Sequence, residues 1–446
     1  MKQIEHTRLQ NGLDIYCIKY DSPVTFAQLY TPFGGDTLRY KDTKSSKNMR
    51  LKPGSAHYFE HVLFIMPPRG ESITTLTPER QDNLTDGLTE LHNLGAIDAN
   101  AYTSNDHTNY HFITRKNFEP CLDLLLDFVF TPYLPKERFA QEVGTILDEA
   151  KRGLNHATHA QYNQWHEQAF KKHGARNPIV GTLDSIPKIS LEDVLSMHST
   201  FYAPSNMSLV IAGHVDLQSV STLAQKRFES LGKENYVNPP KKTRNTEPVE
   251  TVIRNNLDNP MTRKDIIRPS VLMGWKQVLD PTRMSTSDMI DQHTMMSLIG
   301  DMLFSRGSYR RESFIAKGFD EDSFDGRCHS TRETGLIYGW GDTDDPREYV
   351  RLIQAEVDCL KKTGFEKKEL DHIRSGALMN IERSMQKIVQ FSLILAKWDA
   401  KTGDLSSFPA TVNRLKTITL DEVNEKIEDY LADSKLSIVS MVPEEK

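Results

Sequence analysis

Cysteine is scarce in this chain, with four residues in 446 and no C-x-x-C pair among them. Isolated cysteines predict neither a thiolate zinc site nor a disulfide framework, and they favour a reducing compartment. The sequence also lacks an apolar run of the about 18 residues that span a bilayer. Its opening residues, MKQIEHTRLQNG, lack the apolar core of a secretory signal. We therefore expect a cytoplasmic protein with no membrane span.

A strong excess of one charge is absent as well. The formal net charge is -6, which gives no global attraction to nucleic acid, so we expect no nucleic-acid partner. Low-complexity tracts are also absent, and apolar residues make up 38% of the chain against 26% charged residues. This balance is typical of a globular protein rather than a disordered or fibrous one.

The length exceeds what one hydrophobic core supports, so we predict two domains. Between 236 and 256 the chain becomes polar and contains Pro239-Pro240-Lys241-Lys242, which indicates a linker between domains at 1–235 and 257–446. Predicted strands alternate with predicted helices in both halves, which makes the fold class α+β. The second half loosely echoes the first without a strict repeat.

Apolar periodicity predicts a helix at three places that bear on the site or on the second half. The segment Ser55–Met66 carries Tyr58, Val62 and Ile65 at i, i+4, i+7 spacing, and Pro67-Pro68 after it ends the predicted helix. The other two predicted helices lie at Lys136–Arg152 and Lys367–Gln390.

The first helix contains His57-Tyr58-Phe59-Glu60-His61. Residues four apart lie one turn apart, so His57 and His61 can direct two imidazoles to one cation, and zinc suits them. Glu60 lies three residues after His57 on nearly the same face, where a general base for a water activated by the ion would stand. The alternative is a chance match with ordinary surface or core histidines. Apolar residues on the opposite arc leave His-Glu-His as the one polar patch of the helix, which favours metal binding.

A catalytic zinc usually has three protein ligands, so a third is needed. Glu142 and Glu149 are seven residues apart and share one face of the Lys136–Arg152 helix, although surface acids at a helix edge have the same spacing. Rival ligands follow in His156 and His159, with His166 further on. Spacing alone leaves the choice open.

Four segments, taken together, resemble the pitrilysin-type or M16 metallopeptidases. The first is the run from Gly54 to Phe64 around the histidines. The others follow in the order that the family has them: Ala99–Ser104 with Thr108–Tyr110, the acids Glu142 and Glu149, and Tyr202–Val215.

This resemblance implies a zinc endopeptidase of flexible peptides. Glu149 would be the third ligand to Zn²⁺ beside His57 and His61, with Glu142 an outer carboxylate that orients or tunes the site. An extended peptide would add as a strand to the edge formed by Asn100, Ala101, Tyr102 and Thr103. A plainer interpretation makes Asn100 a turn residue ahead of the strand.

The resemblance also implies two related α+β domains that form half of a clamshell. The first domain would bind metal and catalyse, and the second would enclose substrate and dimerise. The partner would be an identical chain or a related one. The alternatives are a non-catalytic partner or scaffold subunit of a peptidase complex, and a metal-storage or zinc-sensing protein.

Some features depart from the family pattern. Extra residues within 67–83 lengthen the stretch between His61 and Glu149 and could gate the site. Phe59 stands where leucine is usual. The segment Leu303–Phe324 is similar to a second-domain stretch of small bacterial members, but it leaves the Arg/Tyr substrate contacts of that stretch unassigned.

Overall fold

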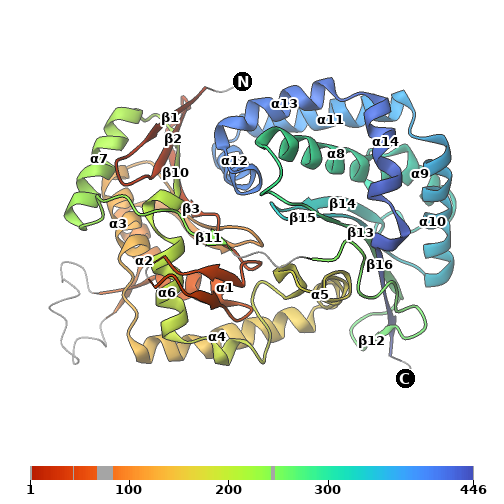
Figure 1. The fold of residues 1–446 in the computed structure, drawn as a ribbon, viewed down its shortest axis with the longest axis horizontal. Coiled ribbons are helices and arrows are strands. Elements are labelled where there is room, and N and C mark those ends of the chain that lie inside the picture. Colours follow the sequence, from red (N-terminus) through yellow and green to blue (C-terminus); the bar gives the residue numbers. More distant parts are fainter. Residues whose placement is uncertain (1–2, 44, 68–83, 243–246, 445–446) are drawn as a thin grey trace. The chain divides into compact units, whose positions relative to one another are not determined.

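The computed structural model describes residues 3–43, 45–67, 84–242 and 247–444, which form two compact units (Figure 1). Unit 1 consists of Met1–Lys151, Asn177–Arg244 and Ser384–Ala400, and unit 2 consists of Arg152–Arg176, Asn245–Arg383 and Lys401–Lys446. The units overlap only in part with the consecutive domains predicted at 1–235 and 257–446. Each unit includes one segment from the other half of the chain.

Unit 1 is built on a six-stranded sheet in the order β1-β2-β10-β3-β9-β8. Its strands are β1 (Ile4–Arg8), β2 (Asp14–Lys19), β3 (Thr25–Thr31), β8 (Ala96–Thr103), β9 (Thr108–Thr114) and β10 (Ser208–Gly213). Strand β10 runs parallel to β2 and antiparallel to β3, and the remaining pairs are antiparallel. Strand β8 is therefore an edge of this sheet.

The two faces of the unit 1 sheet are covered by different helices. Alternate residues such as Leu29 and Ile211 join the core formed with the helices of the first half. These helices are α1 (Ser55–Leu63), α2 (Gly87–Leu94), α3 (Phe118–Phe130), α4 (Lys136–Asn155), α6 (Leu191–Phe201) and α7 (Leu217–Ser230). The opposite face receives α12 (Ile388–Thr402) from the second half, since Tyr30 donates a hydrogen bond to Asp399 at 2.8 Å.

Unit 2 repeats this plan. Its sheet has the order β12-β16-β13-β15-β14, with a parallel β12–β16 pair followed by antiparallel pairs, which matches β2-β10-β3-β9-β8 strand for strand. The strands are β12 (Met261–Arg263), β13 (Ser270–Val278), β14 (Asp325–Ser330), β15 (Thr334–Asp342) and β16 (Leu436–Pro443). The two units are thus related α+β domains, as predicted.

Both faces of the unit 2 sheet are covered too. Val271 and Met273 pack against the helices of the second half, while Leu272 packs against Trp165 of α5 (Ala157–Ala169), whose indole N–H donates to Ser437 at 2.9 Å. Figure 1 shows α5 and α8 on opposite sides of this sheet. The second-half helices are α8 (Thr286–Phe304), α9 (Tyr309–Ala316), α10 (Pro346–Thr363), α11 (Lys367–Met385), α13 (Phe408–Thr417) and α14 (Leu420–Tyr430).

Two helix predictions need correction. The first helix ends at Leu63 rather than Met66, because Ile65–Met66 forms strand β6 and pairs with β7 (Thr85–Asp86). The single helix predicted at Lys367–Gln390 is two helices, α11 and α12, because the chain turns after Met385. The extra residues at 67–83 lie almost entirely outside the described residues. Among the described residues, no helix is both long and apolar enough to cross a membrane.

Candidate metal centre

A close contact between two backbone segments holds the N-terminus of helix α1 in unit 1. Gly54 caps its N-terminus in the left-handed region, with φ of 91°. A Cβ at this residue would lie 2.7 Å from the carbonyl oxygen of Val180 and 2.8 Å from Cα of Gly181, so only glycine allows the two backbones to approach. This close contact sets where the histidines of α1 stand.

Helices α1 and α4 bring three metal-ligand groups together. Nε2 of His57 lies 3.5 Å from one carboxylate oxygen of Glu149, and Nε2 of His61 lies 3.5 Å from the other. Within the part of the chain that the structure describes, this is the only group of three or more His, Cys, Asp or Glu side chains close enough to hold a metal ion. The exposed fraction rises from 12% for the His57 side chain to 40% for Glu149, so the group opens to solvent on the Glu149 side.

The donor set fits a zinc ion. Ligand atoms at the usual zinc distances of about 2.0–2.1 Å in a tetrahedral arrangement lie about 3.4 Å from one another. The two 3.5 Å separations between imidazole nitrogens and Glu149 oxygens agree with this value. Two imidazoles and one carboxylate are a typical catalytic set, and they leave a fourth position for water.

Glu142 contacts the group from outside. Nδ1 of His61 donates a hydrogen bond to the Glu142 carboxylate at 3.0 Å, which leaves the lone pair of Nε2 available to a metal ion. Burial lowers the pKa of His61, but the hydrogen bond to Glu142 and the nearby charges of Glu60, Glu142 and Glu149 outweigh it, so the pKa is raised above its ordinary value. The imidazole therefore lies in a strongly negative environment, which also attracts a cation.

One link between α1 and α4 was not visible in the sequence. The Tyr58 hydroxyl donates to the Phe139 carbonyl at 2.5 Å, and the two rings pack with centroids 4.8 Å apart. Tyr58 follows His57 directly, and Phe139 precedes Glu142 by about one helical turn. This contact therefore holds the two helices at the spacing that the donor set needs.

Glu60 is buried, with 8% of its surface exposed, and its carboxylate accepts a hydrogen bond from the Thr103 hydroxyl at 2.6 Å. Thr103 is the last residue of β8. From the sequence, Thr103 is predicted only to contact a peptide substrate through its main chain. Its side chain instead connects the carboxylate expected to act as base with the edge strand.

The edge of β8 is open to a further strand, since among the described strands β8 pairs with β9 alone. Asn100, Ala101 and Tyr102 lie within this strand, opposite His111, Tyr110 and Asn109 of β9. Asn100 is thus a strand residue and not a turn residue. Its side-chain oxygen accepts a hydrogen bond from the Ala101 N–H at 2.8 Å, so one main-chain N–H of β8 is already hydrogen-bonded to this side chain.

The rival histidines do not join the group. His156 and His159 are exposed where α5 begins, with rings 4.6 Å apart. His166 is buried in unit 2, where its ring donates to the Ala175 carbonyl at 2.8 Å and burial lowers its pKa to about 4. Among the described residues, neither location brings a third metal-ligand group beside these rings.

Two of the three arginines in the segment Leu303–Phe324 have hydrogen-bond partners inside unit 2. Arg310 forms ion pairs with Glu356 and Glu369, each at 2.7 Å. Arg311 donates to the carbonyls of Glu321 and Phe324. Within unit 2 both guanidinium groups therefore have structural partners.

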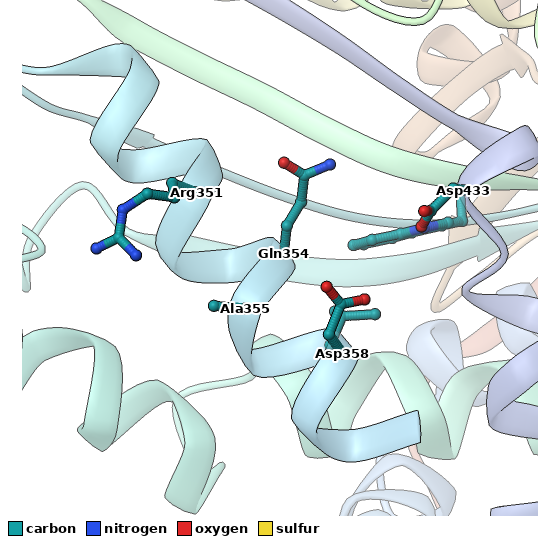
Figure 2. Close-up of a pocket in the computed structure, with 7 residues that line it drawn as sticks. Arg351, Gln354, Ala355, Asp358 and Asp433 are labelled. Atoms are coloured by element: carbon teal, nitrogen blue, oxygen red, sulfur yellow. The ribbon is translucent and has the colours of Figure 1, made fainter. Parts of the chain in front are cut away.

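Unit 2 also contains a pocket of about 310 Å³ between α10, β13 and the chain at Asp433. Arg351, Gln354 and Asp358 of α10 line it, and Figure 2 shows the Arg351 guanidinium turned away from Asp433. Its charged rim is already paired, with Arg351 bound to Glu348 at 2.6 Å and Asp433 bound to Lys361 at 3.2 Å. Among the described residues the indole N–H of Trp275 is buried without a hydrogen-bond partner, and the pocket does not gather three metal-ligand side chains.

Two imidazoles and a carboxylate with a buried glutamate beside them are the kind of site that metal-dependent hydrolases use. The chain belongs to the M16 peptidase family. The family model described as "Insulinase (Peptidase family M16)" matches residues 45–183, and "Peptidase M16 inactive domain" matches residues 188–377. The recognition of this family from sequence motifs is thereby confirmed.

Two curated relatives are similar over most of the chain. "Uncharacterized zinc protease YmfH" of Bacillus subtilis is 27% identical over 98% of this chain and 96% of that protein. "Mitochondrial-processing peptidase subunit beta" of Lentinula edodes is 23% identical over 87% of this chain and 80% of that protein.

Solved structures share the fold. An M16-like peptidase from Alicyclobacillus acidocaldarius superimposes with a TM-score of 0.86 and 23% identity over 99% of both chains. Pitrilysin matches with a TM-score of 0.73 and 16% identity over 100% of this chain but 45% of its own length. The α+β fold of two related domains is confirmed by these similarities.

Proposed function

We propose that this chain is a zinc-dependent endopeptidase, with His57, His61 and Glu149 as ligands of Zn²⁺ and Glu60 as general base. The observation that carries the proposal is the gathering of three ligand atoms beside a buried glutamate at an open sheet edge. The names of the relatives, which include several zinc proteases, support the same reaction class.

A bound zinc ion would supply Lewis-acid chemistry by lowering the pKa of a water molecule and polarising the peptide carbonyl. Glu60 would accept the proton of the attacking water and then deliver it to the leaving amine. The Thr103 hydroxyl holds one Glu60 oxygen, and the other oxygen would accept the proton. Glu142 fixes the ring of His61 through Nδ1.

The substrate would be an extended, flexible peptide added as a strand to β8 along Asn100, Ala101, Tyr102 and Thr103. Main-chain hydrogen bonds supply most of the affinity in this mode and tolerate many sequences. Asn100 can switch its side-chain oxygen from the Ala101 N–H to the incoming backbone, because both partners are main-chain donors.

The proposal is tested by metal content and metal removal. We expect about one zinc per purified chain and hydrolysis of a flexible fluorogenic peptide. A chelator should abolish this activity, and added zinc, but not magnesium, should restore it. Zinc without hydrolysis would favour the non-catalytic subunit or metal-storage alternatives, and chelator-resistant hydrolysis would exclude a metal mechanism.

The contact between Thr103 and Glu60 gives a finer prediction. Thr103→Val removes the hydroxyl at nearly constant volume, and a hydrogen bond to a charged group contributes about 1.5–3 kcal/mol. We expect kcat to fall by about 10-fold or more, with KM and zinc content nearly unchanged. Thr103→Ser, which keeps the hydroxyl, should retain activity. Equal losses in both variants would mean that Thr103 acts through packing instead.

We further propose that two such chains pair, either as a homodimer or with a related chain, in the cytoplasm. The match to 45% of pitrilysin supports pairing, since this chain is similar to about half of that longer protein. Sedimentation of the pure protein, together with co-purification from its own cells, would distinguish an identical partner from a related one.

A further inference from the structure

A small sheet in unit 1 carries a group of positive charges on its outer face. It consists of β11 (Lys241–Lys242), β4 (Arg39–Lys41) and β5 (Asn48–Arg50), in that order. Arg39 lies opposite Arg50, and Lys41 lies opposite both Asn48 and Lys241. Residues directly opposite each other in antiparallel strands share a face, so these positions lie together. We call Arg39, Lys41 and Arg50 the basic face.

The residue between the cations of β4 points inward. The Tyr40 side chain is fully buried and its hydroxyl is hydrogen-bonded to Ser196 at 2.7 Å. The acid that follows β4, Asp42, is buried as well, where its carboxylate accepts from Thr200 at 3.1 Å and from the Ser45 N–H at 2.9 Å. Because Tyr40 and Asp42 are buried, only the cations Arg39 and Lys41 of this stretch are exposed to solvent.

The basic face lacks a counter-charge of its own. All three cations are exposed, and none forms an ion pair with a carboxylate of the described residues. Like charges directly opposite each other destabilise a strand pair, so repulsion between Arg39 and Arg50 destabilises the pairing of β4 with β5. A bound external anion would relieve this repulsion. In a chain with net charge -6, this concentration of unpaired cations is a local exception.

The face is close along the chain to the candidate metal centre. His57 lies seven positions after Arg50, and that stretch spans at most about 25 Å when fully extended. A peptide of about seven residues lying in the site could therefore reach the basic face. On one face of an extended strand, successive side chains are about 6.8 Å apart. Arg39 and Lys41, two residues apart in β4, have the same spacing.

We propose that the basic face binds an acidic segment of the peptide substrate, so that the preferred substrates carry Asp or Glu outside the cleaved bond. This inference rests on the proposed peptidase function. The overall negative charge of the chain opposes approach to anionic membranes and nucleic acid, whereas a short acidic peptide experiences mainly the local field.

The test separates binding from cleavage. A labelled peptide with a Glu-rich flank and its Gln-flanked counterpart are titrated against the Glu60→Gln variant, which cannot turn them over. We expect the acidic peptide to bind about 10-fold more tightly, with an advantage that falls as salt rises. Arg39→Gln/Arg50→Gln should abolish this difference. The matched control is Lys264→Gln/Arg283→Gln, which removes two exposed cations of unit 2 and should retain it.

Circular dichroism checks that each variant is folded. A preference for the acidic peptide that survives Arg39→Gln/Arg50→Gln would overturn the inference. So would binding through these arginines to phosphatidylserine vesicles or an oligonucleotide but not to the peptide. If the wild-type protein cleaves neither peptide while acidic binding still depends on the arginines, the peptidase proposal fails and the acidic-peptide site stands.

Discussion

Glu60→Gln is expected to remove nearly all peptide hydrolysis while leaving zinc bound. The amide has the size of the carboxylate and can still accept the Thr103 hydrogen bond, so the buried side chain keeps its place. It cannot accept a proton from water, and the loss of a general base costs roughly 10²–10⁴-fold in kcat. We expect a fall of about 10³-fold, measured with a fluorogenic peptide beside the zinc content of the same sample.

The matched control is Glu137→Gln, which makes the same chemical change at an exposed position in the first turn of α4. This variant should keep wild-type turnover. Hydrolysis that survives in Glu60→Gln would sink the assignment of Glu60 as base, and with it the proposed mechanism. Loss of zinc in Glu60→Gln would instead make this glutamate a ligand.

Glu149→Gln is expected to lose the metal itself. A neutral amide oxygen is a much weaker zinc ligand than a carboxylate, and the two imidazoles that remain cannot hold the ion alone. Glu142→Gln should behave differently, because Glu142 lies outside the group of three ligands and is hydrogen-bonded to Nδ1 of His61. Loss of such an outer partner costs about 10–100-fold in affinity or activity, so much of the zinc should remain.

Zinc per chain after dialysis against a zinc buffer measures both effects. His156→Ala is the control, since it removes an exposed imidazole of the rival pair and should leave the zinc content unchanged. Zinc lost in His156→Ala but retained in Glu149→Gln would show that the third ligand had been wrongly assigned.

The sequence could predict the part of the site that lies within one helix. A four-residue spacing on a helix places His57 and His61 on one side, and the structure brings their Nε2 atoms to one carboxylate. The third partner comes from α4, far along the chain, where spacing left Glu149 and His156 as open alternatives. The family resemblance favours Glu149, and the structure places its carboxylate beside both histidines, while their role as ligands remains a prediction.

The features that the sequence missed are contacts between elements. Nothing in the order of residues indicates that Thr103 would face Glu60 or that Tyr58 would reach a carbonyl of α4. The break between α11 and α12 was missed for a related reason. The residues there, Ser384 to Phe391, include neither proline nor glycine, so the helical pattern continues where the chain turns.

The exchange of α5 and α12 between the two halves has a consequence for how the protein is made. The sheet that carries β8 keeps one face bare until Ile388–Thr402 leaves the ribosome, because Tyr30 finds its partner Asp399 only there. The first half of the chain supplies its own main core, but it cannot cover the second face of its sheet during synthesis. The sheet that carries β8 is thus covered on both faces only when translation is almost finished, so a half-made chain would lack the finished form of the proposed peptide-binding edge.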